Sequence, residues 1–195
     1  MIKVVLFDLD GVLIKDPIFS TVYAAEFGIK QEDMLPFFSQ EFIDCTSGEA
    51  DLKNALRPYL KTWKWRGTVE ELISYWLKHH QLIDVQILNL VKSVREQGIK
   101  VGLQTNQEKY RLHHIWNTLA FNKRFDYLYA SCELKERKPH SGFFTKILQD
   151  LKPIESSEIL FIDDSLHNIA VAKDFGFRTY FYANYEELKK FIETL

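Results

Sequence analysis

The chain has 195 residues, of which 46% are hydrophobic and 27% charged, and its formal net charge is −2. This composition is ordinary for a globular protein and allows one sizeable domain, or a core with a smaller second unit. The near-neutral charge provides no basic field of the kind that attracts nucleic acid, and no apolar window reaches the length of a membrane span. We therefore expect neither a nucleic-acid nor a membrane partner. The two cysteines, Cys45 and Cys132, lie far apart and predict reduced thiols in a cytoplasmic protein.

The first apolar run, Ile2–Phe7, is typical of a buried strand because β-branched and aromatic residues fill it without a polar break. Asp8 and Asp10 follow at the point where this strand ends, and Gly11 allows a sharp turn directly after them. In open α/β sheets, ligands bind outside the carboxyl ends of the strands. Two neighbouring carboxylates repel each other, so this pair favours a bound cation or a shared proton at that edge.

Residues 16–84 contain almost no strand pattern and several helical ones. The pattern predicts four helices in this segment: one after Asp16-Pro17, one over Glu32–Ile43, one over Glu49–Trp63 with a break at Pro58, and one that opens with a capping-box pattern at Thr68. An all-helical insert directly after the first strand is expected to form a lid over the strand ends. Its many tyrosine and tryptophan side chains are expected to form its core.

Strands and helices alternate from about residue 85 to residue 195, which favours a mainly parallel sheet with helices on both faces. The expected strands cover Ile99–Thr105, Phe125–Ala130, Ile159–Asp163 and Arg178–Tyr182. The expected helices cover Val85–Gln97, Lys109–Leu119, Ser141–Leu151, Leu166–Phe175 and Tyr185–Thr194. The fold class is therefore predicted to be α/β.

Polar side chains stand at the ends of the later strands as well. They are Thr105 and Asn106 after the second strand, Lys138 after the third, and Asp163 and Asp164 after the fourth. In a parallel sheet all of these positions face the same edge as Asp8. The sequence therefore predicts one cluster of carboxylates, a hydroxyl with a neighbouring amide, and an ammonium group.

The chemistry open to such a cluster is restricted. Hard oxygen ligands without His or Cys favour Mg²⁺ over zinc or copper. The Asp8 carboxylate can attack phosphorus and form an aspartyl phosphate, while Thr105 and Lys138 can stabilise charge on the phosphoryl oxygens. Asp10 is placed to give a proton to the leaving oxygen and later to take one from water. Each residue alone would be read as part of a turn or of the surface, but together, in this order, they predict phosphoryl transfer.

The chain resembles the haloacid dehalogenase superfamily of phosphohydrolases. Four motifs carry the resemblance: Asp8-Leu9-Asp10-Gly11-Val12, Thr105-Asn106, Lys138-Pro139, and Asp163-Asp164-Ser165 with Asn168 downstream. The resemblance implies a Rossmann-like α/β core formed by residues 1–15 and 85–195. It also implies a helical C1-type cap, with four helices, formed by residues 16–84 and inserted after the first strand.

The resemblance also implies the roles of the site residues. Asp8 would be the nucleophile and Asp10 the acid/base, Thr105 and Asn106 would hold the phosphate, and Lys138 would steady Asp8. Mg²⁺ would be bound by Asp8, the backbone carbonyl of Asp10, and Asp164, with Asp163 helping directly or through water. Two positions depart from many relatives, which carry an acidic residue where Lys15 stands and Asp where Asn168 stands.

The predicted function is Mg²⁺-dependent hydrolysis of a small phosphomonoester, such as a phosphosugar, by a monomer or homodimer. A phosphomutase of the β-phosphoglucomutase type shares every core residue and stays open. Dehalogenation of a 2-haloacid is disfavoured, because members with that activity typically lack the second aspartate of the first motif. A receiver-like signalling domain would arrange its Asp, Thr and Lys in another order. A non-catalytic binding protein would be expected to lose Asp8, Asp10 or Lys138.

The cap is expected to select the substrate. Its polar candidates are Glu49, Asp51, Arg57, Lys61, Lys64 and Arg66, together with the loop at residues 46–49 between two expected helices. Charge on a helix is more often a solvated face than a binding site, so these residues are candidates only.

Overall fold

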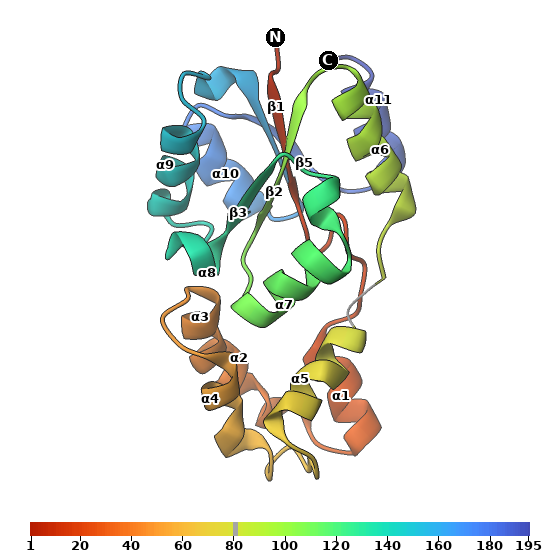
Figure 1. Cartoon of the computed structure of the whole chain (residues 1–195), viewed down its shortest axis with the longest axis vertical. Coiled ribbons are helices and arrows are strands. Elements are labelled where there is room, and N and C mark those ends of the chain that lie inside the picture. Colours follow the sequence, from red (N-terminus) through yellow and green to blue (C-terminus); the bar gives the residue numbers. More distant parts are fainter. Residues whose placement is uncertain (80–81) are drawn as a thin grey trace.

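The computed structural model describes residues 1–79 and 82–195 of the chain. Its centre is a sheet of five parallel strands in the order β3-β2-β1-β4-β5. The strands are β1 (Val4–Asp8), β2 (Lys100–Thr105), β3 (Tyr127–Ala130), β4 (Ile159–Asp163) and β5 (Arg178–Phe181). The predicted α/β, Rossmann-like parallel sheet is confirmed, because β1 lies in the middle and all strands end at the same edge (Figure 1).

Helices cover both faces of the sheet, and alternate residues of β1 are therefore buried on opposite sides. Val5 and Phe7 belong to an apolar cluster with α6 and α11, whereas Val4 and Leu6 belong to one with α9 and α10. The helices that follow the cap are α6 (Val85–Glu96), α7 (Lys109–His113), α8 (Ser131–Leu134), α9 (Ser141–Asp150), α10 (Leu166–Asp174) and α11 (Tyr185–Ile192). Full burial on both faces explains why β1 and β4 are continuous apolar runs up to their final aspartates.

The segment that begins after β1 forms a helical cap, which here means residues 19–78. Its helices are α1 (Phe19–Phe27), α2 (Leu35–Ser39), α3 (Glu41–Thr46), α4 (Leu52–Leu56) and α5 (Val69–Lys78). The cap lies against the carboxyl ends of the strands and has an apolar core of its own (Figure 1). Trp63 and Trp76 are buried in that core, and Tyr59, Trp65 and Tyr75 pack against it. The aromatic residues therefore form the cap core, as predicted.

The cap differs from the prediction in how its helices are divided. The predicted helix Glu32–Ile43 is split into a 3₁₀ turn and the short helices α2 and α3, while α4 ends at Leu56, just before Pro58. Asp16 does not cap α1, because its carboxylate instead accepts a hydrogen bond from the backbone N–H of Leu82 at 3.0 Å. The capping box between Thr68 and Glu71 is present at the start of α5, as predicted. The division of the chain into domains at residues 16–84 stays a prediction.

Two adjacent connections join the cap to the sheet. The backbone N–H of Lys15 donates to the carbonyl of Leu82 at 3.0 Å, and the backbone N–H of Asp84 donates to the carbonyl of Leu13 at 2.9 Å. The ammonium of Lys15 lies 4.2 Å from the ring centroid of Tyr182. The outgoing and returning chains are therefore paired side by side.

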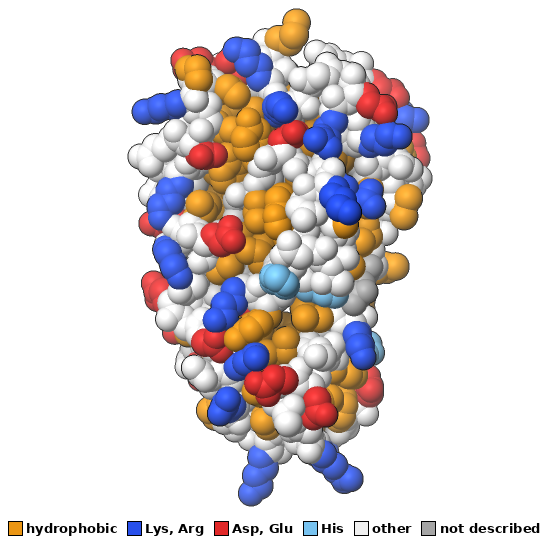
Figure 2. Space-filling model, viewed as in Figure 1, with side chains coloured by type: hydrophobic (Ala, Val, Ile, Leu, Met, Phe, Trp, Pro, Cys, Tyr) orange, Lys and Arg blue, Asp and Glu red, His pale blue; other side chains and the backbone are white. Residues whose placement is uncertain are grey.

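Among the described residues, none of the helices combines the length and apolar composition needed to cross a bilayer. Cys45 and Cys132 are both free and buried. Figure 2 shows basic and acidic side chains mixed over one face, in keeping with the small net charge of −2.

Candidate active site

Lys138 lies at the centre of the polar cluster at the carboxyl edge of the sheet. Its ammonium nitrogen is 2.9 Å from Asp8 Oδ1 and 2.8 Å from Asp163 Oδ2, so it bridges the ends of β1 and β4. Only 4% of Lys138 is exposed. Burial lowers the pKa of Lys138, but the charges of Asp8 and Asp163 outweigh it and raise the pKa above its ordinary value. The lysine is therefore a fixed positive charge between two carboxylates.

Asp8 is buried at the end of β1. Burial raises its pKa well above the ordinary value, Lys138 opposes this rise, and the charges of Asp163 and Asp10 add to it. The backbone N–H of Leu9 donates to Asp8 Oδ1 at 2.7 Å. One lysine does not balance the acidic groups gathered here, so the site favours a further cation next to Asp8.

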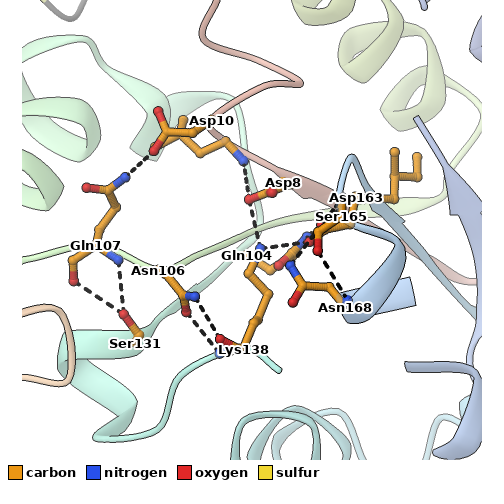
Figure 3. Close-up of polar contacts among 12 residues, drawn as sticks. Asp8, Asp10, Gln104, Asn106, Gln107, Ser131, Lys138, Asp163, Ser165 and Asn168 are labelled. Atoms are coloured by element: carbon orange, nitrogen blue, oxygen red, sulfur yellow. Dashed lines mark hydrogen bonds and ion pairs between the residues drawn. The ribbon is translucent and has the colours of Figure 1, made fainter. Parts of the chain in front are cut away.

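Asp163 has hydrogen-bond donors on both carboxylate oxygens (Figure 3). Lys138 and the amide of Gln104 donate to Oδ2 at 2.8 and 3.2 Å. The backbone N–H of Ser165 and the side-chain amide of Asn168 each donate to Oδ1 at 2.9 Å. Burial raises the pKa of Asp163, but Lys138 and the hydrogen bonds to the carboxylate outweigh it and lower the pKa below its ordinary value. Asn168 thus orients this carboxylate, where an Asp would repel it.

A metal ion fits beside this cluster. Asp8, Asp163 and Asp164 each offer a carboxylate oxygen, and these oxygens lie within 4.8 Å of one another. An all-oxygen donor set of this kind suits Mg²⁺. Burial and the charge of Asp163 raise the pKa of Asp164, so a divalent cation would relieve the repulsion. Because Asp163 already accepts several hydrogen bonds, Asp8 and Asp164 are the better candidates for direct ligands.

Thr105 and Asn106 lie where β2 ends. Thr105 is buried. The side chain of Asn106 binds both backbone groups of Lys138, accepting from its N–H and donating to its carbonyl, each at 2.9 Å. Asn106 therefore holds the loop that carries the lysine, and phosphate binding by Thr105 and Asn106 stays a prediction.

The side chain of Asp10 is turned toward α7. Arg111 donates to its two carboxylate oxygens at 2.6 and 2.7 Å, and the amide of Gln107 donates to Oδ2 at 2.5 Å. Figure 3 shows Asp10 pointing toward Gln107. Metal binding by Asp10, which was predicted through its backbone carbonyl, remains a prediction.

The sequence reasoning did not find Arg111 or Gln107 as partners of Asp10. Gln107 precedes α7 and Arg111 lies within it, so helical spacing does not pair them. Polar residues at the start of a helix are usually solvated, and the contact with Asp10 spans about a hundred positions of sequence.

The cap touches the sheet domain close to this site. Asp51, at the start of α4, accepts a hydrogen bond from Tyr110 at 2.8 Å and lies 2.5 Å from the ammonium of Lys109. The hydroxyl of Ser131 donates to the carbonyl of Thr46 at 2.5 Å. The loop at residues 46–49 therefore contacts the sheet domain through Thr46, and its predicted contact with substrate stays a prediction.

The other charged cap candidates are placed differently. Lys61, Lys64 and Arg66 line a hollow with Glu26 and Phe27. They belong to the connection from α4 to α5, which lies at the end of the cap remote from the sheet (Figure 1), where basic side chains project into solvent (Figure 2). Their position does not favour the predicted contact with substrate.

The comparisons with known proteins agree with the motifs. The family model for haloacid dehalogenase-like hydrolases matches residues 5–182. The chain is 27% identical to the pyrophosphatase PpaX of Bacillus cereus strain Q1 over 196 aligned positions, covering 91% of this chain and 82% of the relative. It is 28% identical to PpaX of Bacillus anthracis, with the same coverage.

Solved structures with the same fold cover nearly the whole chain. A HAD family enzyme from Bacteroides thetaiotaomicron, in complex with magnesium and inorganic phosphate, is 24% identical with a TM-score of 0.81, covering 96% of this chain and 99% of that one. A HAD-like family hydrolase from Porphyromonas gingivalis is 25% identical with a TM-score of 0.78, covering 94% and 92%. L-2-haloacid dehalogenase from Xanthobacter autotrophicus is 16% identical with a TM-score of 0.68, covering 97% and 82%, and is similar in fold alone.

Proposed function

Since the chain belongs to the haloacid dehalogenase-like hydrolases, we propose that it is a Mg²⁺-dependent phosphatase that hydrolyses a small phosphomonoester through an aspartyl phosphate on Asp8. The observation that carries the proposal is the placement of Lys138, 2.9 Å from Asp8 and 2.8 Å from Asp163, beside the acidic group of Asp8, Asp163 and Asp164. A nucleophilic carboxylate, a fixed ammonium and a site for a divalent cation are what phosphoryl transfer requires.

The proposed reaction has two steps. A carboxylate oxygen of Asp8 attacks phosphorus while the bond from phosphorus to the leaving oxygen breaks, and Asp10 gives that oxygen a proton. Water then attacks the aspartyl phosphate, Asp10 takes a proton from it, and Asp8 is regenerated as phosphate leaves. Lys138 holds Asp8 and stabilises charge on the phosphoryl oxygens. Mg²⁺, when bound by Asp8 and Asp164, would add charge stabilisation and substrate orientation.

Small phosphorylated metabolites are the proposed substrate class. Inorganic pyrophosphate is a second candidate, because the relatives from two Bacillus species are pyrophosphatases. A phosphomutase would use the same residues of the sheet edge but return the phosphoryl group to the substrate. Dehalogenation of a 2-haloacid is disfavoured by the presence of Asp10 and of the acidic pair Asp163-Asp164 at the end of β4.

The first experiment measures phosphate release from p-nitrophenyl phosphate with Mg²⁺ and with a chelator. We expect turnover that requires Mg²⁺ and is lost in Asp8→Asn, while the circular dichroism spectrum is unchanged. Asp174→Asn, an exposed aspartate of α10, is the matched control and should keep full activity. Turnover that persists in Asp8→Asn or in the chelator would contradict the proposal.

A substrate panel then separates the candidates. Phosphosugars, other small phosphomonoesters and pyrophosphate are compared by phosphate release, and transfer within a phosphosugar is followed by ³¹P NMR. Free phosphate as the main product supports a phosphatase, whereas an isomeric phosphosugar without net phosphate release identifies a mutase.

A further inference from the structure

Arg111 connects the cap to the predicted acid/base residue. Its guanidinium gives Asp10 two hydrogen bonds, from Nη1 to Oδ2 at 2.7 Å and from Nη2 to Oδ1 at 2.6 Å. This forked geometry fixes both the position and the plane of a carboxylate. The Arg111 side chain is 10% exposed and that of Asp10 is 51% exposed. A buried guanidinium thus holds a carboxyl group that is half exposed to solvent.

The body of the Arg111 side chain lies under the apolar core of the cap. Together with Glu108 it lines a cavity of about 10 Å³ whose other walls are cap residues. These cap residues are Phe42, Leu52, Ile73, Trp76 and Leu77. The start of α7 is fixed as well, because Glu108 accepts from the backbone N–H groups of Tyr110 at 2.8 Å and Arg111 at 2.5 Å. Packing against the cap and the capping of α7 by Glu108 leave the guanidinium of Arg111 little freedom to move.

We propose that Arg111 is a positioning residue that holds the carboxyl group of Asp10 at the place where it transfers a proton to the leaving oxygen. This inference rests on the proposed function, since it needs Asp10 as the acid/base. Gln107 donates to the same carboxylate from the side. Burying an arginine is unfavourable unless its charge is paired, and Asp10 provides that pairing for Arg111. A purely structural ion pair would satisfy that requirement too, and the test must separate the two roles.

The leaving group of the substrate provides that separation. A p-nitrophenolate ion leaves without a proton, whereas the alkoxide of an alkyl phosphate such as glycerol phosphate requires one. For Arg111→Gln we expect kcat/KM to fall about 10- to 100-fold more on the alkyl phosphate than on p-nitrophenyl phosphate. This loss is smaller than the roughly 10²–10⁴-fold that a general acid contributes, because Asp10 is still present but less well positioned. Arg111→Lys, which keeps the charge but loses the fork, should lie between the wild type and Arg111→Gln.

The matched control is Arg95→Gln. Arg95 also pairs with an aspartate, Asp126, at 3.1 Å, but Asp126 directly precedes β3, at the end of the strands away from Asp8. It should leave the ratio of the two kcat/KM values unchanged. A double variant completes the design: in the Asp10→Asn background, Arg111→Gln should cause no further loss on the alkyl phosphate, because the proton donor is already absent.

Equal losses on both substrates, or the same additional loss in the Asp10→Asn background, would overturn the role of Arg111 while leaving the phosphatase intact. A wild type that hydrolyses neither substrate with Mg²⁺ would instead overturn the proposed function, and this inference with it. If Arg111→Gln does not fold, the ratio is measured on Arg111→Lys, and an unchanged ratio there counts against the proposal.

Discussion

Gly11 decides the geometry of the acidic cluster although it has no side chain. Its φ angle is +81°, a conformation that L side chains rarely adopt. A Cβ atom at this position would lie 1.9 Å from Oδ2 of Asp164. The turn after β1 therefore has to be glycine for two independent reasons, and one of them is the close approach of a candidate metal ligand.

Gly11→Ala is expected to weaken Mg²⁺ binding by about 10- to 100-fold, in the range seen when groups that orient metal ligands are lost. The displaced carboxylate of Asp164 is the physical reason. Mg²⁺ titration by calorimetry measures the effect. Gly98→Ala is the control, because its φ angle is +80° but nothing lies within 4 Å of the added Cβ. Equal Mg²⁺ affinities in the two variants would show that the approach of Asp164 is unimportant.

At the scale of an element, α7 joins the cap to the sheet domain through Asp51. Burial raises the pKa of Asp51, but hydrogen bonds from Lys109, Tyr110 and backbone N–H groups outweigh it and lower the pKa to about 2. A carboxyl group whose pKa is lowered on folding stabilises the folded state above its ordinary pKa. That contribution is lost as the pH falls through the lowered value.

Asp51→Asn is therefore expected to lower the melting temperature at pH 7. The difference from the wild type should shrink as the pH falls from about 4 toward about 2, because the wild type then loses the same charge. Thermal unfolding followed by circular dichroism over this pH range measures it. Asp44→Asn, an exposed aspartate of the cap, controls for the mere loss of acidic charge. A difference that stays constant down to pH 2 would show that the ionised Asp51 does not couple the cap to α7.

At the scale of the whole molecule, the order β3-β2-β1-β4-β5 brings polar groups from distant parts of the chain to one edge. The cap then lies over that edge (Figure 1). Three carboxylates come within 4.8 Å there, and the single charge of Lys138 balances only part of their mutual repulsion, which opposes folding. A divalent cation should therefore stabilise the fold as well as the reaction.

Mg²⁺ at about a hundred times its Kd is expected to add about 2.7 kcal/mol to the free energy of unfolding, or roughly 5 to 10 °C to the melting temperature of a chain of this size. Differential scanning calorimetry with and without a chelator measures the shift. Asp164→Asn should lose most of it, and Asp174→Asn should keep it. A wild-type melting temperature that is the same with and without Mg²⁺ would contradict the proposed metal site.

The amino-acid sequence by itself determined the strands and the edge at which they end. Ile159–Asp163 was predicted with the bounds that the structure has, because an unbroken apolar run buried on both faces leaves little choice of conformation. The polar residues at or just after the ends of β1, β2, β3 and β4 were predicted to lie together, since parallel strands end on one side of the sheet. The short cap helices were predicted less well, because five- and six-residue helices depend on packing more than on local propensity.

The tertiary structure decided the partners of these residues. The contacts of Asp10 with Arg111 and of Asp163 with Gln104 and Asn168 depend on how loops and helices pack across the sheet edge. Asp16 likewise accepts a hydrogen bond from Leu82, on the far side of the cap in the sequence, instead of capping the next helix. The periodicity of apolar residues predicts which face of an element is buried, but it does not predict which distant polar group that face will contact. Hydrogen bonds and ion pairs form only when the two groups come within a few ångströms of each other, and the folded chain alone determines which groups do so.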